Sequence, residues 1–419
     1  MQNHRYAASL GGLFATAALA FTAAPATAQS SDLQIPQLEG SATGSSTGPE
    51  ITQHDGAPTP RPFTSDYLAG FPSDISSYQY GIYVDINKLF FTVRDERADV
   101  REENLNKAVE INNAAADNPD LIKRAQIDAS ADKDGVLPAV SDALGEETGQ
   151  ALRDALAEHR LPKTEYLLGN GYLARAGGLA SSQIAEKYIF DYDRPFVVAS
   201  DKINRYEDGE HDFYGSSPSF PSGHTNQAAW ITTLLAYMLP ELGPQIISRG
   251  GESGFHRVVM GVHYPLDVIG GRMSGQAAAA DRLNDPRMRD AIDQAAAELR
   301  AELEWRTGKS IEELVAQDSG AQSDADAVGR YSELLDYGFD TIYPEDAPMQ
   351  VPQAAPVLLA HAYPELSWEQ RAEVLRQTAG PAGNPLDWQA EDGSWQRLNL
   401  AAAMAADVQV NPDGSVTVN

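Results

Sequence analysis

Apolar residues recur at helical spacing through most of the region from 97 to 315. Leu105, Ala108 and Val109 fall on one face of a helix that Asn118-Pro119 interrupts. Further helices are expected at 138–157, 224–240, 243–258 and 264–283. No stretch of this central body alternates apolar and polar residues as a half-buried strand does. The body is therefore predicted to be all-α, a bundle of helices.

Composition divides the rest of the chain. Residues 29–62 are rich in Ser, Thr, Gly and Pro, which is typical of a flexible lead-in. Residues 316–330 are rich in small and acidic residues and are expected to form a linker. These boundaries predict a helical domain over 63–315 and a C-terminal extension over 331–419.

The extension is expected to be mixed in structure but mostly helical. Ser367 to Gln370 predicts a capping box at the start of a helix. Residues 411–415 predict the turn of a terminal hairpin, or lie in a frayed end. Its role is left open by the sequence.

The N-terminus has the pattern of a signal peptide. His4 and Arg5 precede an uncharged apolar stretch at 10–24, and Ala26-Thr27-Ala28 is a small-x-small cleavage site. Residues 1–28 are therefore predicted to be removed, leaving a periplasmic or secreted protein. Later apolar runs are shorter than the roughly 20 residues of a membrane span, so no transmembrane segment is expected in the mature chain.

Composition narrows the possible partners. The 60 acidic and 31 basic residues give a formal charge of −29, which argues against nucleic acid as a partner. The chain has no cysteine, which excludes disulfides and thiolate metal sites. A small anionic substrate would need a local concentration of positive charge.

Such a concentration is expected around Pro221-Ser222-Gly223-His224, which precedes an apolar helix. A helix N-terminus offers unpaired N–H groups and the positive end of the macrodipole to an anion. Lys187 could add a point charge, and Arg194 and Arg257 could add planar forks that bind two oxygens each. With Ser222 and Gly223, these residues form a candidate phosphate cradle.

Two histidines could supply the chemistry of phosphoryl transfer. His263 and Asp267 are four residues apart, so both can lie on one helix face. A carboxylate that binds one ring nitrogen leaves the other free to attack, which makes His263 the candidate nucleophile and His224 the candidate acid. The alternative is structural: His224 caps a helix and His263 is a buried, hydrogen-bonded histidine.

A catalytic metal is not expected. No His-x-x-x-His or HExxH spacing is present, and the nearby cations oppose the binding of another cation. His211 and His256 are expected to support the site or to lie at the surface. Roles for His54, His159 and His361 are not assigned.

The motifs occur in a recognisable order. Lys187 is followed by six residues and Arg194-Pro195, then by Pro221-Ser222-Gly223-His224, then by Arg257, five residues, His263, three residues and Asp267. This pattern resembles the three-part signature of the type 2 phosphatidic acid phosphatase superfamily, which includes bacterial class A acid phosphatases and vanadium haloperoxidases. The resemblance implies an all-α bundle of the acid phosphatase/haloperoxidase type.

The resemblance also implies roles for the residues. Phosphate would be bound by Lys187, Arg194, Ser222, Gly223 and Arg257. His263 would form a phosphohistidine, Asp267 would orient it, and His224 would protonate the leaving alcohol. One departure is His256, where the family usually has Ser before the third-motif Arg. The Ser248-Arg249 pair lies too far from His263 to replace that motif.

The function expected is an exported, metal-independent phosphatase that hydrolyses small phosphate monoesters without a cofactor. The alternatives are a haloperoxidase that holds vanadate as its cofactor in the same cradle, and a non-enzymatic protein with a degenerate cradle. The sequence leaves open the natural substrate, the oligomeric state and the pH optimum.

Overall fold

The computed structural model describes residues 50–67, 83–169, 174–177, 183–317 and 320–419. The helices and the two strands of these residues are α1 (Leu89–Glu96), α2 (Ala98–Ala114), α3 (Pro119–Asp134), α4 (Val136–Val140), α5 (Glu146–Ala157), α6 (Pro162–Thr164), α7 (Ile184–Phe190), α8 (Pro195–Val198), α9 (Gly223–Met238), α10 (Gly243–Val259), α11 (Pro265–Asn284), α12 (Pro286–Thr307), α13 (Ile311–Gln317), α14 (Asp324–Asp336), α15 (Trp368–Gln377), α16 (Leu400–Met404), β1 (Val408–Val410) and β2 (Val416–Val418). A π-helical turn at Glu165–Gly169 and short 3-10 turns connect some of them. The prediction of an all-α body is confirmed.

Helices α9, α10 and α11 form the centre, and α9 packs against both of the others. The sequence allows α11 to approach α9 closely because glycines face it. A Cβ at Gly271 would lie 2.5 Å from the backbone oxygen of Ser222, and one at Gly275 would lie 2.6 Å from the Cβ of Ala229. This close packing brings the start of α11, with Asp267, against the start of α9, with His224.

Helix α3 covers another side of α10 and is tied to it by buried charge. The guanidinium of Arg249 on α10 donates from Nη1 and Nη2 to the two carboxylate oxygens of Asp128, at 2.8 and 2.5 Å. Both side chains are nearly inaccessible to solvent. A buried pair with two parallel hydrogen bonds fixes the orientation of one helix against the other.

The helix expected at 138–157 is broken, so that expectation was wrong. Helix α4 ends at Val140, a 3-10 turn follows, and α5 begins only at Glu146. The break lies at Gly145, whose φ of 95° is one that a residue with a side chain rarely adopts. The chain therefore turns at this glycine.

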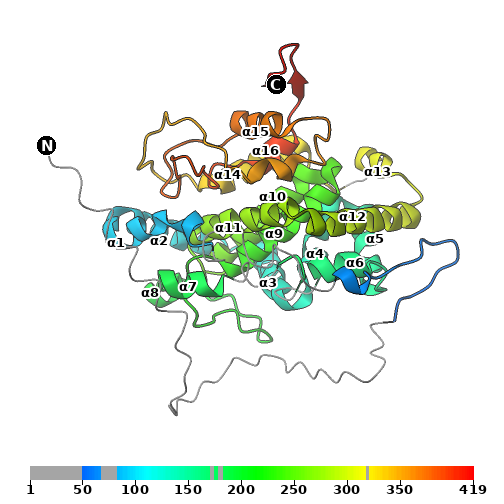
Figure 1. Ribbon diagram of the computed structural model, residues 1–419. Helices are drawn as coiled ribbons and strands as arrows, with labels where there is room; N and C mark the ends of the chain where they lie inside the picture. The colour runs from blue at the N-terminus through cyan, green and yellow to red at the C-terminus, as the bar shows by residue number, and fades with distance from the viewer. Residues whose placement is uncertain (1–49, 68–82, 170–173, 178–182, 318–319) are drawn as a thin grey trace, which may run out of the picture. The chain divides into compact units, whose positions relative to one another are not determined.

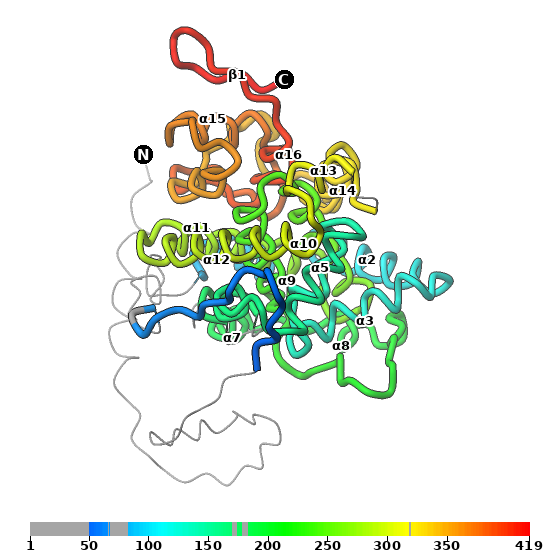
Figure 2. The backbone as a smooth tube through the Cα atoms, turned by 90° about the vertical axis from the view of Figure 1, so that its right-hand side faces the viewer, coloured from blue at the N-terminus to red at the C-terminus, as the bar shows by residue number. Residues whose placement is uncertain are grey.

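The C-terminal extension packs on the helical body. In both views α14, α15 and α16 lie on the side of α10 and α11 opposite to α7 and α8 (Figure 1, Figure 2). Arg272 of α11 donates to the backbone oxygens of Leu335 and Gln396, at 3.1 and 2.8 Å. These hydrogen bonds from a buried arginine fix the position of the extension on α11, in addition to apolar packing.

Local elements of the extension agree with expectation in two places and differ in one. Ser367 and Gln370 form the capping box of α15. β1 and β2 pair antiparallel around the predicted turn, which confirms the hairpin. Helix α14, however, begins at Asp324 with Ser323 as its N-cap, inside the range expected as a linker.

The N-terminal expectations are tested only in part. The signal peptide at 1–28 lies outside the described residues. Of the lead-in, the described part contacts the body: Arg160 donates to the backbone oxygens of Thr52 and Pro58, both at 2.8 Å. Within the described parts of the chain, no helix is long and apolar enough to cross a membrane.

Candidate active site

The N-terminus of α9 is linked directly to α11. Ser222 is the N-cap of α9, and its Oγ accepts hydrogen bonds from the N–H (3.3 Å) and the hydroxyl (2.8 Å) of Thr225. The backbone N–H of Ser222 donates to the backbone oxygen of Asp267, at 2.9 Å. Gly223 is the first residue of the helix. The second and third motifs therefore meet through their backbones.

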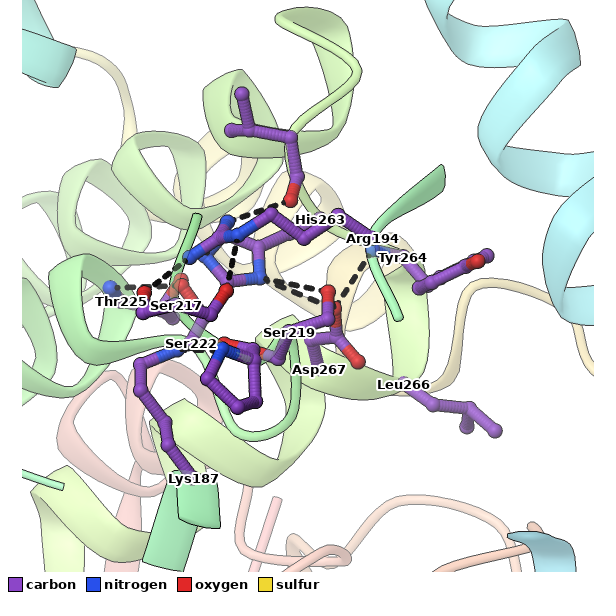
Figure 3. A network of polar contacts seen from close by, with 12 residues as sticks. Lys187, Arg194, Ser217, Ser219, Ser222, Thr225, His263, Tyr264, Leu266 and Asp267 are labelled. Atoms are coloured by element: carbon purple, nitrogen blue, oxygen red, sulfur yellow. Dashed lines mark hydrogen bonds and ion pairs between the residues drawn. The ribbon is translucent and has the colours of Figure 1, made fainter. Parts of the chain in front are cut away.

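His263 is held between an acceptor and a donor (Figure 3). Its Nδ1 lies 3.0 Å from Oδ2 of Asp267, and its Nε2 lies 3.2 Å from Nη1 of Arg194. A guanidinium can only donate and an ionised carboxylate can only accept. The ring is therefore the tautomer that carries its proton on Nδ1, with the lone pair on Nε2.

Asp267 receives three hydrogen bonds on the same oxygen. Besides His263, Oδ2 accepts from the backbone N–H of Tyr264 at 3.0 Å and from Oγ of Ser219 at 2.5 Å. Burial raises the pKa of Asp267 to about 6, although these hydrogen bonds and the charges of Lys187 and Arg194 oppose the rise. The carboxylate is fixed in position by the loop before α9 as well as by its own helix.

The first-motif cations are anchored by that same loop. Arg194 donates from Nε to the backbone oxygen of Ser217 (2.7 Å), from Nη2 to its Oγ (3.0 Å), and from Nη1 to the backbone oxygen of Val262 (2.8 Å). Lys187 donates from Nζ to the backbone oxygens of Pro218 and Ser219, at 2.8 and 3.0 Å. Residues 217–219 thus set where the two positive charges lie.

These charges act on His263, the candidate nucleophile. Burial, followed by the charges of Arg194, Lys187 and Arg257, lowers the pKa of His263 well below its usual value. Burial and the charge of Arg194 likewise lower the pKa of Lys187. His263 is 1% exposed and is held neutral, which is the state that a nucleophilic imidazole requires.

The side chain of His224 is more exposed to solvent than that of His263. Its side chain is 24% exposed, and its Nε2 lies 3.5 Å from Oδ2 of Asp132 on α3. Burial and the charge of Arg257 lower the pKa of His224 to about 4, whereas Asp132 opposes that shift. His224 therefore lies where a leaving group could reach solvent, with a carboxylate behind it.

The structure brings all the predicted site residues into one region, and it adds three that sequence reasoning missed. Ser217 and Ser219 lie just before the second motif, and their clustering with Pro218 in a short polar loop was the available signal. Asp132 had a weaker signal, its spacing of four residues from Asp128 on one helix face. The functional roles of all these residues stay predictions.

The other histidines are engaged elsewhere. Nδ1 of His256 lies 2.5 Å from Asp128, the carboxylate that also binds Arg249. Burial would raise the pKa of Asp128, but Arg249 and His256 outweigh it and hold that pKa below its usual range. The four other histidines in the described part of the chain each lie within 3.5 Å of a carboxylate: His54 of Glu158, His159 of Glu165, His211 of Asp208 and His361 of Asp293.

His256, at the position where Ser was expected, thus takes part in the packing of α3 against α10. The Ser248-Arg249 pair contributes its arginine to the same contact between α3 and α10. Among the described residues, no group of three or more His, Asp or Glu side chains is arranged to hold a metal ion.

The region that holds the three motifs is also the region that is similar to known proteins. Residues 167–283 match the sequence profile of the PAP2 superfamily. The chain is 32% identical over 142 residues to a non-specific acid phosphatase of Salmonella typhi, covering 34% of this chain and 53% of that protein. It is 30% identical over 178 residues to a non-specific acid phosphatase of Providencia stuartii, covering 42% of this chain and 68% of that protein. The matched part therefore spans about half of the first relative and about two thirds of the second.

Proposed function

Because the chain belongs to the PAP2 superfamily, we propose that it is a phosphatase that hydrolyses phosphate monoesters without a metal or another cofactor. The relatives named as acid phosphatases support the reaction class. The observation that carries the mechanism is the environment of His263, whose Nε2 lone pair is directed to Arg194 while Asp267 holds Nδ1–H.

In the first step, Nε2 of His263 attacks phosphorus, and the bond from phosphorus to the ester oxygen breaks. His224, in its protonated form, gives its proton to the departing alcohol oxygen. Lys187, Arg194 and Arg257, with the N–H groups at the start of α9, stabilise the charge on the three equatorial oxygens. The product is a phosphohistidine at His263.

In the second step, neutral His224 takes a proton from water, and the resulting hydroxide attacks phosphorus. The N–P bond breaks, inorganic phosphate leaves, and the lone pair returns to His263. Asp267 stabilises the charge that the imidazole carries while it is phosphorylated. We further propose that this chemistry takes place outside the cytoplasm, on the basis of the signal-peptide pattern at 1–28.

The test is hydrolysis of para-nitrophenyl phosphate by the purified protein in EDTA. We expect turnover to survive EDTA and to be inhibited by micromolar orthovanadate. A rapid alkaline quench should trap phosphate on the protein in an acid-labile, alkali-stable bond, and His263→Ala should remove it. Loss of activity in EDTA that returns with a divalent cation would refute metal independence. Bromide oxidation with peroxide and vanadate, without hydrolysis, would instead indicate the haloperoxidase.

A further inference from the structure

A large groove lies between the helical body and the C-terminal extension, apart from the phosphate cradle. Its volume is about 810 Å³, within the usual range for sites that bind small organic ligands. Residues before α1 and on α11 form one wall, and residues 352–354, 368, 388, 391–393 and 395 of the extension form the other. The extension therefore completes a cavity that the helical body alone would not have.

Aromatic rings are concentrated in this groove. Trp368, Trp388 and Trp395 line it, which is three of the five tryptophans in the chain. Trp395 is buried, but Trp368 is 38% exposed and so presents indole surface to a ligand. Flat apolar surfaces with a polar edge are the feature that tryptophan contributes to binding sites.

The charge of the lining excludes an anionic ligand. The described lining residues include three carboxylates, those of Asp85, Glu391 and Asp392, and one cation, Lys88. A phosphate, a nucleic acid or an anionic lipid headgroup would be repelled by this excess of carboxylates. The groove is therefore not an extension of the phosphate cradle.

The place that an organic cation would take is filled by the chain itself. Nζ of Lys88 lies 3.6 Å from the ring centroid of Trp388 and 3.1 Å from Oδ2 of Asp392. A cation over an indole with a carboxylate beside it is a satisfied cation–π arrangement. What remains for a ligand is indole surface bordered by hydrogen-bonding groups: the carboxylates of Asp85 and Glu391 and the amide of Gln353. The amide nitrogen of Asn284 already donates to the backbone oxygen of Ala354, at 3.0 Å.

From this lining we propose that the groove binds a neutral saccharide. A sugar ring has a C–H face that packs on an indole, and a rim of hydroxyls that donate to carboxylates and exchange hydrogen bonds with amides. Trp388 adds a half-buried indole to the lining, beside the more exposed ring of Trp368. The combination matches the chemistry of a glycan better than that of an apolar or charged ligand.

The binding would be independent of catalysis. Helix α11 carries Asp267 near its start, and its two groove-lining residues, Met273 and Asn284, follow six and 17 residues later. At 1.5 Å per residue the groove therefore extends from roughly 9 Å to roughly 25 Å beyond Asp267 along the helix. The groove would hold the enzyme on a polysaccharide or a glycan-bearing surface while the phosphate cradle stays open. This proposal does not rest on the proposed function.

The experiment is calorimetric titration of the purified protein with maltotriose, cellotriose and triacetylchitotriose, each to 20 mM. We expect saturable binding of at least one of them. Trp368→Ala should weaken it about three- to tenfold, the range expected for losing one aromatic contact. Val315→Ala, an equally exposed apolar residue on α13 at 41%, should leave it unchanged. The far-ultraviolet circular dichroism spectra of both variants should match that of the parent, which shows that they are folded.

Three outcomes would overturn the proposal. The first is no heat and no change in tryptophan fluorescence with any of the three sugars. The second is equal sugar affinity in the parent and in both Trp368→Ala and the milder Glu391→Gln, which would place binding elsewhere. The third is saturable binding of benzyltrimethylammonium without a response to sugars, which would assign the groove to organic cations.

Discussion

Asp132 offers the sharpest test of the acid role of His224. The change is Asp132→Asn, which keeps the size of the side chain and removes its charge. Asp132 opposes the lowering of the pKa of His224, which is about 4 in the folded protein. Removal of the carboxylate should therefore lower that pKa further. The protonated fraction of His224 falls as pH rises above its pKa, so the variant loses its acid at lower pH.

The size of the shift follows from the geometry. The two side chains lie 3.5 Å apart and are 24% and 20% exposed. A neighbouring opposite charge shifts a pKa by about 1 to 3 units, and partial exposure favours the lower end. A one-unit shift, about 1.4 kcal/mol, moves the pKa of His224 to about 3. The protonated fraction would then fall about twofold at pH 3 and about tenfold at pH 6.

The assay is kcat/KM for para-nitrophenyl phosphate between pH 3 and pH 7. This constant reports the ionisation of the free enzyme, and ionisation of the substrate cancels in the ratio of parent to variant. The ratio should rise with pH to a plateau near tenfold. Asp134→Asn is the matched control, because Asp134 is an exposed carboxylate at the end of the same helix. It should keep the ratio near one.

Two results would refute the reasoning. A ratio that is large but independent of pH would mean that Asp132 acts on structure and not on the ionisation of His224. A ratio within twofold at every pH would mean that His224 is not the acid or that Asp132 does not face it in solution. Circular dichroism at both ends of the pH range separates either result from unfolding.

Other substitutions test the rest of the site. His263→Ala should lower kcat by more than about 10⁴-fold, and residual turnover above one per cent would remove it from the nucleophile role. Arg257→Ala should cost about 3 kcal/mol of transition-state stabilisation, roughly 150-fold in kcat/KM, and a loss below threefold would contradict its contact with phosphate. Ser219→Ala should lower kcat about tenfold by removing a hydrogen bond to a carboxylate and Ser219→Thr should restore it, whereas equal losses in both would indicate a packing role. His256→Ser should lower the free energy of unfolding in urea by about 1–2 kcal/mol while kcat/KM stays within threefold, and a larger loss of activity would place it in the site.

The sequence was sufficient for the parts of the site that depend on short spacing. His263 and Asp267 are four residues apart and in contact, as expected. The expectation that both lie on one helix face was wrong, because α11 begins at Pro265 and the backbone is extended at Tyr264, so His263 precedes the helix. The anion-binding start of α9 follows from Ser222-Gly223 before an apolar run. These elements are local, and local patterns determine them.

Contacts between distant segments could not be read in the same way. Asp132 reaches His224 only because α3 lies along α9 and α10, and the four-residue spacing of Asp128 and Asp132 does not say which helix α3 packs against. The break at Gly145 was missed because an apolar face continues across it, although the backbone turns there with a positive φ. The groove with its three tryptophans depends on how the extension meets α11, which the composition of either part does not encode.

His256, where the family usually has Ser, shows how contacts between distant segments can support the site. Successive helical residues point about 100° apart, so His256 can face α3 while Arg257 lowers the pKa of the two candidate catalytic histidines. Asp128 and Asp132 of α3 likewise have separate contacts. Asp128 binds Arg249 and His256 and fixes α3 on α10, and Asp132, one turn later, lies beside His224. The position of the carboxylate behind the candidate acid therefore depends on a buried ion pair that never touches phosphate. A residue that departs from the usual motif can be accommodated because it strengthens that support.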